Sequence, residues 1–170
     1  MFQDCTSLTT APDLPATSLA QSCYYNMFRG CTALTTAPAL PATTLASSCY
    51  YYMFYGCTSL ASVPSILPAT TLASSCYSSM FYGCTALTTA PELPAMTLAS
   101  SCYRNMFYNC TSLTTAPALP ATTHAYGCYS GMLYGTSLIP DCSNIRFSDD
   151  SDIASGVCVG LFKGTNITDD

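Results

Sequence analysis

Residues 31–56 read CTALTTAPALPATTLASSCYYYMFYG, and near copies of this unit follow one another along most of the chain. Self-similarity at a fixed period is typical of repeat proteins, in which each unit packs against its neighbours. Two series of cysteines mark the period, each with three spacings of 26 residues and one of 27. The first is Cys5, Cys31, Cys57, Cys84 and Cys110, and the second is Cys23, Cys49, Cys76, Cys102 and Cys128. This period predicts a solenoid, because units of roughly 20–29 residues are typical of leucine-rich repeats.

Each unit divides into two parts with different hydrophobic patterns. Residues 34–37 (Leu-Thr-Thr-Ala) are β-branched at the centre and are followed by Pro38, as expected of a short strand. Residues 45–54 place apolar side chains at i, i+4 and i+8, between a Thr-Thr pair that can supply an N-cap and Gly56 as a C-cap. This pattern predicts a helix. The expected fold class is therefore α/β, a right-handed leucine-rich-repeat-like solenoid of 26-residue strand-loop-helix units with a degenerate C-terminal unit.

The repeat pattern decays toward the C-terminus. The leucine column at residues 19, 45, 72 and 98 continues as His124, and Thr136 stands where the next cysteine is due. We predict a solenoid of about five repeats over residues 1–138 and a divergent terminal repeat with an acidic loop over residues 139–170. The sequence opens inside a unit, which predicts a longer array or an open face covered by another chain.

One eight-residue motif recurs four times, as MFRGCTAL, MFYGCTSL, MFYGCTAL and MFYNCTSL at residues 27–34, 53–60, 80–87 and 106–113. It resembles the BspA-like leucine-rich repeats, which carry a Phe-x-x-Cys-x-x-Leu signature. The sequence departs from that family where Thr-Thr-Ala-Pro replaces an Ile-rich strand. The resemblance implies a surface-exposed or secreted binding array of bacteria, their phages or some protists, used in adhesion, and it implies no catalytic residues.

Composition excludes several classes of partner. Charged residues make up 8% of the chain, against about 25% in ordinary soluble domains, and the net charge is −5. Only four residues are Lys or Arg, so we expect no nucleic-acid binding and no attraction to anionic membranes. No apolar run approaches the roughly 18 residues of a membrane span, and no signal peptide is recognised within these residues.

The cysteines are expected to be structural. Neighbouring solenoid helices would lie roughly 8–10 Å apart, too far for disulfides within the second series. These thiols are then small apolar core groups, whereas sporadic pairing within the first series stays open. Spacings of 18 or 19 residues alternate with spacings of 8 and provide no C-x₂₋₄-C pair, and there is one histidine, so we expect no metal site and no cofactor.

Tyrosines supply the candidate binding residues. Five of them fall on the predicted apolar stripe and are expected in the core: Tyr24, Tyr50, Tyr77, Tyr103 and Tyr129. Seven others fall on the outward side: Tyr25, Tyr51, Tyr52, Tyr55, Tyr82, Tyr108 and Tyr134. Flat amphipathic rings with few rotamers suit protein or carbohydrate recognition. The alternative is a charge-poor surface that uses tyrosine for solubility.

Three weaker candidates have simpler explanations. His124 is a tolerated substitution at the decaying end of a core column, because no catalytic partner stands at a family spacing. The acidic loop at residues 149–152 lacks the Gly and distal Glu of an EF-hand and is expected to be a solvated turn. A threonine column at residues 9, 35, 88 and 114 resembles an ice-binding face in general design, but cross-strand pairing explains it.

The sequence thus predicts a non-enzymatic repeat protein, extracellular, on a cell surface or on a phage particle, that binds a protein or a glycan. The alternative is a self-assembling fibre or filament subunit whose copies stack end to end, since low charge does little to oppose association. Catalysis is not expected, because the repeats supply almost no titratable groups that could converge on a substrate.

Overall fold

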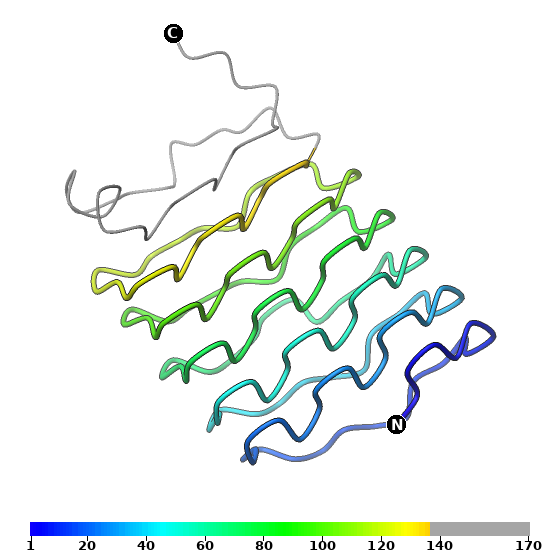
Figure 1. Cartoon of the computed structure of the whole chain (residues 1–170), viewed down its shortest axis with the longest axis horizontal. Coiled ribbons are helices and arrows are strands. Elements are labelled where there is room, and N and C mark those ends of the chain that lie inside the picture. Colours follow the sequence, from blue (N-terminus) through cyan, green and yellow to red (C-terminus); the bar gives the residue numbers. More distant parts are fainter. Residues whose placement is uncertain (137–170) are drawn as a thin grey trace, which may run out of the picture.

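A computed structural model describes residues 1–136 as a stack of similar coils that run parallel to one another (Figure 1). The stack begins with the first coil near Met1 and ends near Thr136, so the repeats of the sequence are consecutive coils of one solenoid. The predicted terminal repeat and acidic loop of residues 139–170 lie outside the described residues. The solenoid prediction is confirmed in this range, and the right-handed winding stays a prediction.

The predicted strand-loop-helix unit is wrong, because residues 1–136 contain neither an α-helix nor an extended strand. Parallel pairing between coils is limited to isolated bridges. One column of such bridges joins five successive coils through Ser18, Thr44, Thr71, Thr97 and Thr123. In the segment predicted as a strand, a single bridge pairs Thr36 with Ser62. The proline that follows each Thr-Thr-Ala segment removes a backbone donor and keeps these pairings short.

The segment predicted as a helix forms a series of turns whose alternate N–H groups bond in two directions. The N–H of Tyr51 donates to the carbonyl of Ser48 within the coil, at 3.2 Å. The N–H of Tyr50 donates instead to Cys76 of the following coil, at 2.9 Å. The same alternation recurs from coil to coil, so half of the backbone donors in this segment link neighbouring coils rather than turns of a helix.

A left-handed backbone conformation recurs at every fourth residue of this segment. In one coil it falls at Ser48, Tyr52 and Gly56, with φ of 56°, 57° and 70°. Such a residue reverses the local curvature, so the chain cannot continue as a right-handed helix. It also repeats side-chain directions every four residues, which explains why the apolar pattern at i, i+4 and i+8 resembled a helix.

The core consists of identical side chains stacked from coil to coil. Phenylalanine rings form one column, with centroids 5.5–5.7 Å apart through Phe2, Phe28, Phe54, Phe81 and Phe107. Tyrosine rings form a second, 5.6–6.0 Å apart through Tyr24, Tyr50, Tyr77, Tyr103 and Tyr129. Contacts at this range require coils about 4.8 Å apart, the spacing of hydrogen-bonded strands, whereas packed helices would hold the columns roughly 8–10 Å apart.

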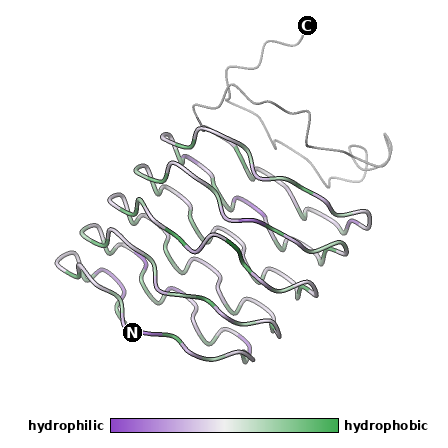
Figure 2. Ribbon diagram, turned by 180° about the vertical axis from the view of Figure 1, so that it is seen from behind, coloured by the Kyte–Doolittle hydropathy of each residue, from purple (hydrophilic) through white to green (hydrophobic). Residues whose placement is uncertain are grey.

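The exterior reflects the shortage of charged residues. Strongly hydrophilic stretches are sparse along the coils, and most of the ribbon is pale or hydrophobic (Figure 2). Residues 1–136 hold three carboxylates, Asp4, Asp13 and Glu92, and two arginines, Arg29 and Arg104. Hydroxyl groups of serine, threonine and tyrosine therefore supply most of the polar surface.

Candidate functional site

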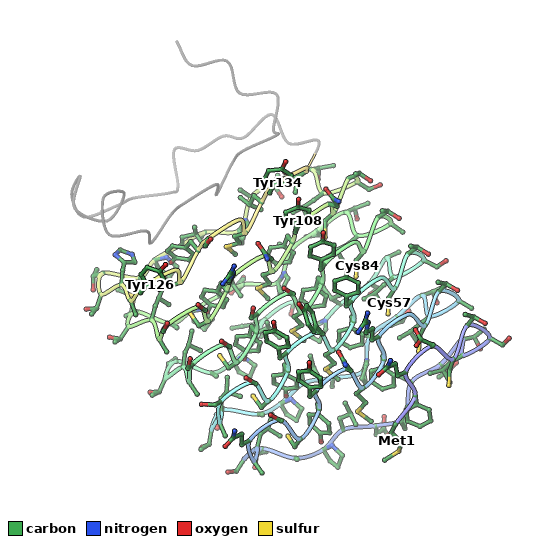
Figure 3. All side chains as sticks on the ribbon, viewed as in Figure 1. Met1, Cys57, Cys84, Tyr108, Tyr126 and Tyr134 are labelled. Atoms are coloured by element: carbon green, nitrogen blue, oxygen red, sulfur yellow. The ribbon has the colours of Figure 1, made fainter. Side chains whose placement is uncertain are left out.

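Four of the outward tyrosines form a third aromatic column, which we call the tyrosine ladder and define as Tyr55, Tyr82, Tyr108 and Tyr134. Ring centroids of successive members are 4.6, 4.5 and 4.5 Å apart, and their planes lie within 15° of parallel. Each ring is half-buried, and the rings of Tyr82 and Tyr108 are stacked on both faces, so that an edge faces solvent. Tyr108 and Tyr134 lie side by side on adjacent coils, away from Tyr126 on the other part of the same face (Figure 3).

Arg29 occupies the ladder position in the first coil. Its guanidinium lies 5.2 Å from the ring centroid of Tyr55 and 6.0 Å from that of Tyr52. A cation at this distance from an aromatic face is attracted by the ring quadrupole. Arg29 thus places a positive charge at the Tyr55 end of the ladder.

The other predicted site residues form a shorter aromatic cluster beside the ladder. Tyr25 and Tyr51 stack at 5.4 Å with planes 1° apart. Tyr52 makes edge contacts with both Tyr51, at 4.1 Å, and Tyr55, at 5.1 Å. The structure therefore brings all seven predicted tyrosines onto one face. The sequence predicted outward rings, whereas stacking leaves six of the seven half-buried. Among these seven only Tyr25 is largely exposed, at 45%.

The phenols of Tyr51, Tyr82 and Tyr108 are neutral at physiological pH. Burial, followed by the charges of the neighbouring phenols, raises the pKa of Tyr82. Burial, followed by the charge and hydrogen bond of Tyr134, raises the pKa of Tyr108 against the opposing hydrogen bond of Tyr82. Burial, followed by the hydrogen bond and charge of Tyr52, raises the pKa of Tyr51 to about 12. The face thus offers aromatic edges and hydroxyl groups that donate and accept hydrogen bonds, with no negative charge of its own.

A notch interrupts the aromatic cluster, and the sequence analysis did not predict it. It has a volume of about 230 Å³ and lies between Tyr51 and Tyr52 on one side and Arg104 and Asn105 on the other. A sequence signal was present, because the third coil reads CYSSMFYG where the second reads CYYYMFYG. Two serines there replace two tyrosines and leave the space open.

Eight of the ten cysteines in residues 1–136 are thiols packed into the core, as predicted for the second series except at exposed Cys23, but the geometric reason was wrong. Coils lie at strand spacing rather than helix spacing, so distance alone does not keep neighbouring cysteines apart. In the first series the four buried thiols instead bind backbone, as in Cys84, whose Sγ donates to the Phe54 carbonyl at 3.2 Å. Burial raises the pKa of Cys49 to about 11 and of Cys76 to about 12, so these groups are unreactive thiols rather than nucleophiles.

The structure gives no support for a functional role of the weaker candidates in residues 1–136. His124 lies partly buried with its ring 5.8 Å from that of Tyr129, within the core column. Thr114 donates its hydroxyl to the Thr88 carbonyl at 3.1 Å, which supports structural pairing in the threonine column. Across residues 1–136 no three His, Cys, Asp or Glu side chains are grouped to hold a metal ion. In the same range no helix has the length and apolarity needed to cross a membrane.

A stack of near-identical coils that presents a continuous aromatic face defines a repeat-solenoid scaffold. Comparison with family profiles identifies the repeat family. The family described as BspA type Leucine rich repeat region matches residues 1–114 and 24–138, with six copies, and the chain belongs to this family. No match was found among curated proteins, and none among solved structures.

Proposed function

We propose that this protein is a non-enzymatic recognition module that is secreted or displayed on a surface and binds a protein or glycan through its tyrosine-rich face. The observation that supports this most directly is the tyrosine ladder, whose rings are held about one coil spacing apart with one edge in solvent. Rings stacked on both sides lose little further entropy on binding, because their rotamers are already fixed. Membership in a family of binding repeats supports the same function.

The ladder suits an extended ligand better than a compact one. It repeats one chemical group along the solenoid axis, so a polymer or an elongated protein surface can contact several rungs at once. Few charges surround it, which removes long-range steering and leaves close contact of aromatic and hydroxyl groups to determine affinity. An adhesive function, in which many modest contacts act together, fits this arrangement.

Glycan arrays and arrays of extracellular-matrix proteins, probed with the purified protein, would test the proposal. The double variant Tyr82→Ser, Tyr108→Ser interrupts the ladder at its centre, and we expect it to reduce binding by about tenfold or more. Tyr126→Ser is the matched control, because Tyr126 is 73% exposed and is not part of the ladder. Binding that survives the double variant, or the lack of any array ligand for the unchanged protein, would contradict the proposal.

A filament subunit is the second candidate function. Its support is the mode of stacking, since each coil bonds to the next through backbone groups that a coil of another chain could equally supply. Electron microscopy across a concentration series distinguishes the two candidates. Filaments of regular width that lengthen with concentration would favour assembly, whereas discrete short rods at every concentration would favour a recognition module.

A further inference from the structure

The notch in the tyrosine-rich face results from two substitutions in one coil. The outward column at residues 25, 51, 78, 104 and 130 begins with two stacked tyrosines and continues with Ser78. The adjacent column replaces Tyr52 by Ser79 in the same coil. Both serines are 2% exposed and form the floor, while the walls come from the coils on either side. The space is thus the volume of the missing rings, bounded by a rigid backbone.

The floor of the notch is polar and presents hydroxyl groups. The Ser78 hydroxyl donates to the Arg104 carbonyl at 3.3 Å, and the Ser79 N–H donates to the same carbonyl at 2.8 Å. Both serines line the notch. A serine hydroxyl can accept hydrogen bonds while it donates one, so the floor can bond the hydroxyl group of a ligand that enters the notch.

The opposite wall supplies a positive charge without a carboxylate beside it. Arg104 is exposed at the rim, and none of the three carboxylates in residues 1–136 lines the notch. Its charge reaches across the space, because it lowers the pKa of Tyr51 against the larger effects of burial and of Tyr52. A guanidinium that shares the notch with hydroxyl donors, and with no carboxylate of residues 1–136, is suited to bind a carboxylate with two parallel hydrogen bonds.

We infer that the notch binds the carboxylate-bearing ring of an acidic sugar, a hexuronic acid residue of a glycan. The volume of about 230 Å³ is below the roughly 300–1,000 Å³ of drug-sized sites, so it fits one ring-sized group of a longer chain. The tyrosine wall packs against the apolar face of the sugar ring, the serines bond its hydroxyls, and Arg104 binds its carboxylate. An acidic peptide side chain would satisfy Arg104 but brings no hydroxyl groups for the serines to bond, which disfavours a peptide ligand. This inference rests on the proposed recognition function and specifies its ligand class.

The test uses D-glucuronate, its uncharged analogue D-glucuronamide, and N-acetylglutamate as a peptide-like carboxylate, with binding measured by saturation-transfer NMR titration. We expect glucuronate to bind about tenfold or more tightly than the amide, because the charge-assisted bond to Arg104 is lost in the amide. Arg104→Ser should remove this difference, and Ser78→Tyr should abolish binding of both sugars by filling the notch. Both replacements are native to the column, since Ser78 and Tyr51 occupy it in other coils.

Two control variants test whether the effects are specific to the notch. Ser130→Tyr makes the same change in the same column outside the notch, and Arg29→Ser removes the other described arginine, which does not line it. Neither should change glucuronate affinity. Equal binding of acid and amide, binding that survives Ser78→Tyr, or tighter binding of N-acetylglutamate would overturn the inference.

The two proposals fail separately. A ligand that depends on Tyr82 and Tyr108, in a protein that does not bind glucuronate, would leave the recognition function standing and remove the acidic-sugar site. Glucuronate binding that depends on Arg104, without any ligand for the ladder, would support the acidic-sugar site and contradict the recognition function of the ladder.

Discussion

The thiol of Cys57 donates a hydrogen bond of 3.0 Å to the carbonyl oxygen of Phe28 in the preceding coil. The same Phe28 carbonyl also accepts the N–H of Cys31 at 3.1 Å. The turn that ends one coil is thereby tied to the next coil through a side chain. Equivalent bonds join Cys31 to Phe2 and Cys110 to Phe81, each at 3.0 Å. This relationship explains why cysteine recurs at this position of the repeat although no metal and no disulfide uses it there.

Replacing Cys57 by alanine removes this bond and leaves a small cavity in a fully buried site. We expect the free energy of unfolding to fall by roughly 1–2 kcal/mol. Cys5→Ala is the control, because Cys5 belongs to the same column but is exposed. This substitution should lower the free energy of unfolding by no more than about 0.5 kcal/mol. Urea denaturation of both variants measures the difference. Equal losses at the two positions would show that the bond contributes nothing.

Gly56→Ala tests the left-handed turns of the coil. Gly56 has φ of 70°, and a β-carbon there would meet nothing within 4 Å, so any loss comes from the backbone conformation. An L-residue in this region costs roughly 1–2 kcal/mol, partly offset by reduced freedom of the unfolded chain. We expect a net loss of about 1 kcal/mol. Gly56→Asn should lower the free energy of unfolding by less than half as much, since Asn109 adopts φ of 56° in the same column. Thermal denaturation checks this order, and a harmless alanine would contradict the backbone assignment.

The stacked phenylalanine column should carry a large part of the stability. Phe54 is fully buried, with its ring 5.5 Å from Phe28 and 5.7 Å from Phe81. Phe54→Ala should lower the free energy of unfolding by roughly 3–5 kcal/mol. Phe54→Leu should cost clearly less, because Leu133 continues the column in the last described coil. Chemical denaturation gives both values, and an unchanged midpoint for the alanine variant would rule out the column as a core element.

Alkaline pH should destabilise the protein through its buried thiols. Burial raises the pKa of Cys57, Cys76 and Cys110 from 9.0 to about 12. Below pH 9 folded and unfolded chains both keep these protons, so stability does not change with pH on their account. Between pH 9 and 12 only the unfolded chain ionises, so stability falls by about 1.4 kcal/mol per pH unit for each thiol. Urea denaturation in reductant at pH 8 to 11 measures the slope. Cys57→Ala should make it shallower, and a flat profile would contradict the burial of these groups.

Alkylation should separate exposed thiols from buried ones. Cys5 and Cys23 are exposed, whereas Cys49 and Cys84 are buried and burial raises the pKa of both. Iodoacetamide at pH 7.5 should label Cys5 and Cys23 in the folded protein, and the buried thiols only after denaturation. Peptide mass spectrometry reports each site. Labelling of Cys84 at the rate of Cys5 would mean that the coils open far more readily than their packing indicates.

The sequence by itself determined the period, the columns of like residues and the family. It identified the buried aromatic residues correctly, because inward positions recur at the same place in every unit: Tyr50 and Phe54 are core residues as predicted. It also placed the seven outward tyrosines on one face. It did not predict the notch, although the Ser-Ser pair at residues 78 and 79 was visible, because a missing side chain becomes a site only when its neighbours in space are known.

The backbone of each coil was decided only by the tertiary structure. An apolar pattern at i, i+4 and i+8 fits an α-helix and also fits a chain of turns with a left-handed residue at every fourth position. The choice depends on where alternate N–H groups find acceptors. The N–H of Phe54 donates to Met80 of the following coil at 2.9 Å, a partner that lies 26 residues away in the sequence. No local propensity encodes that partner. Stacking at strand spacing provides it, and the same spacing brings the aromatic columns into contact, so the coil and its core form together.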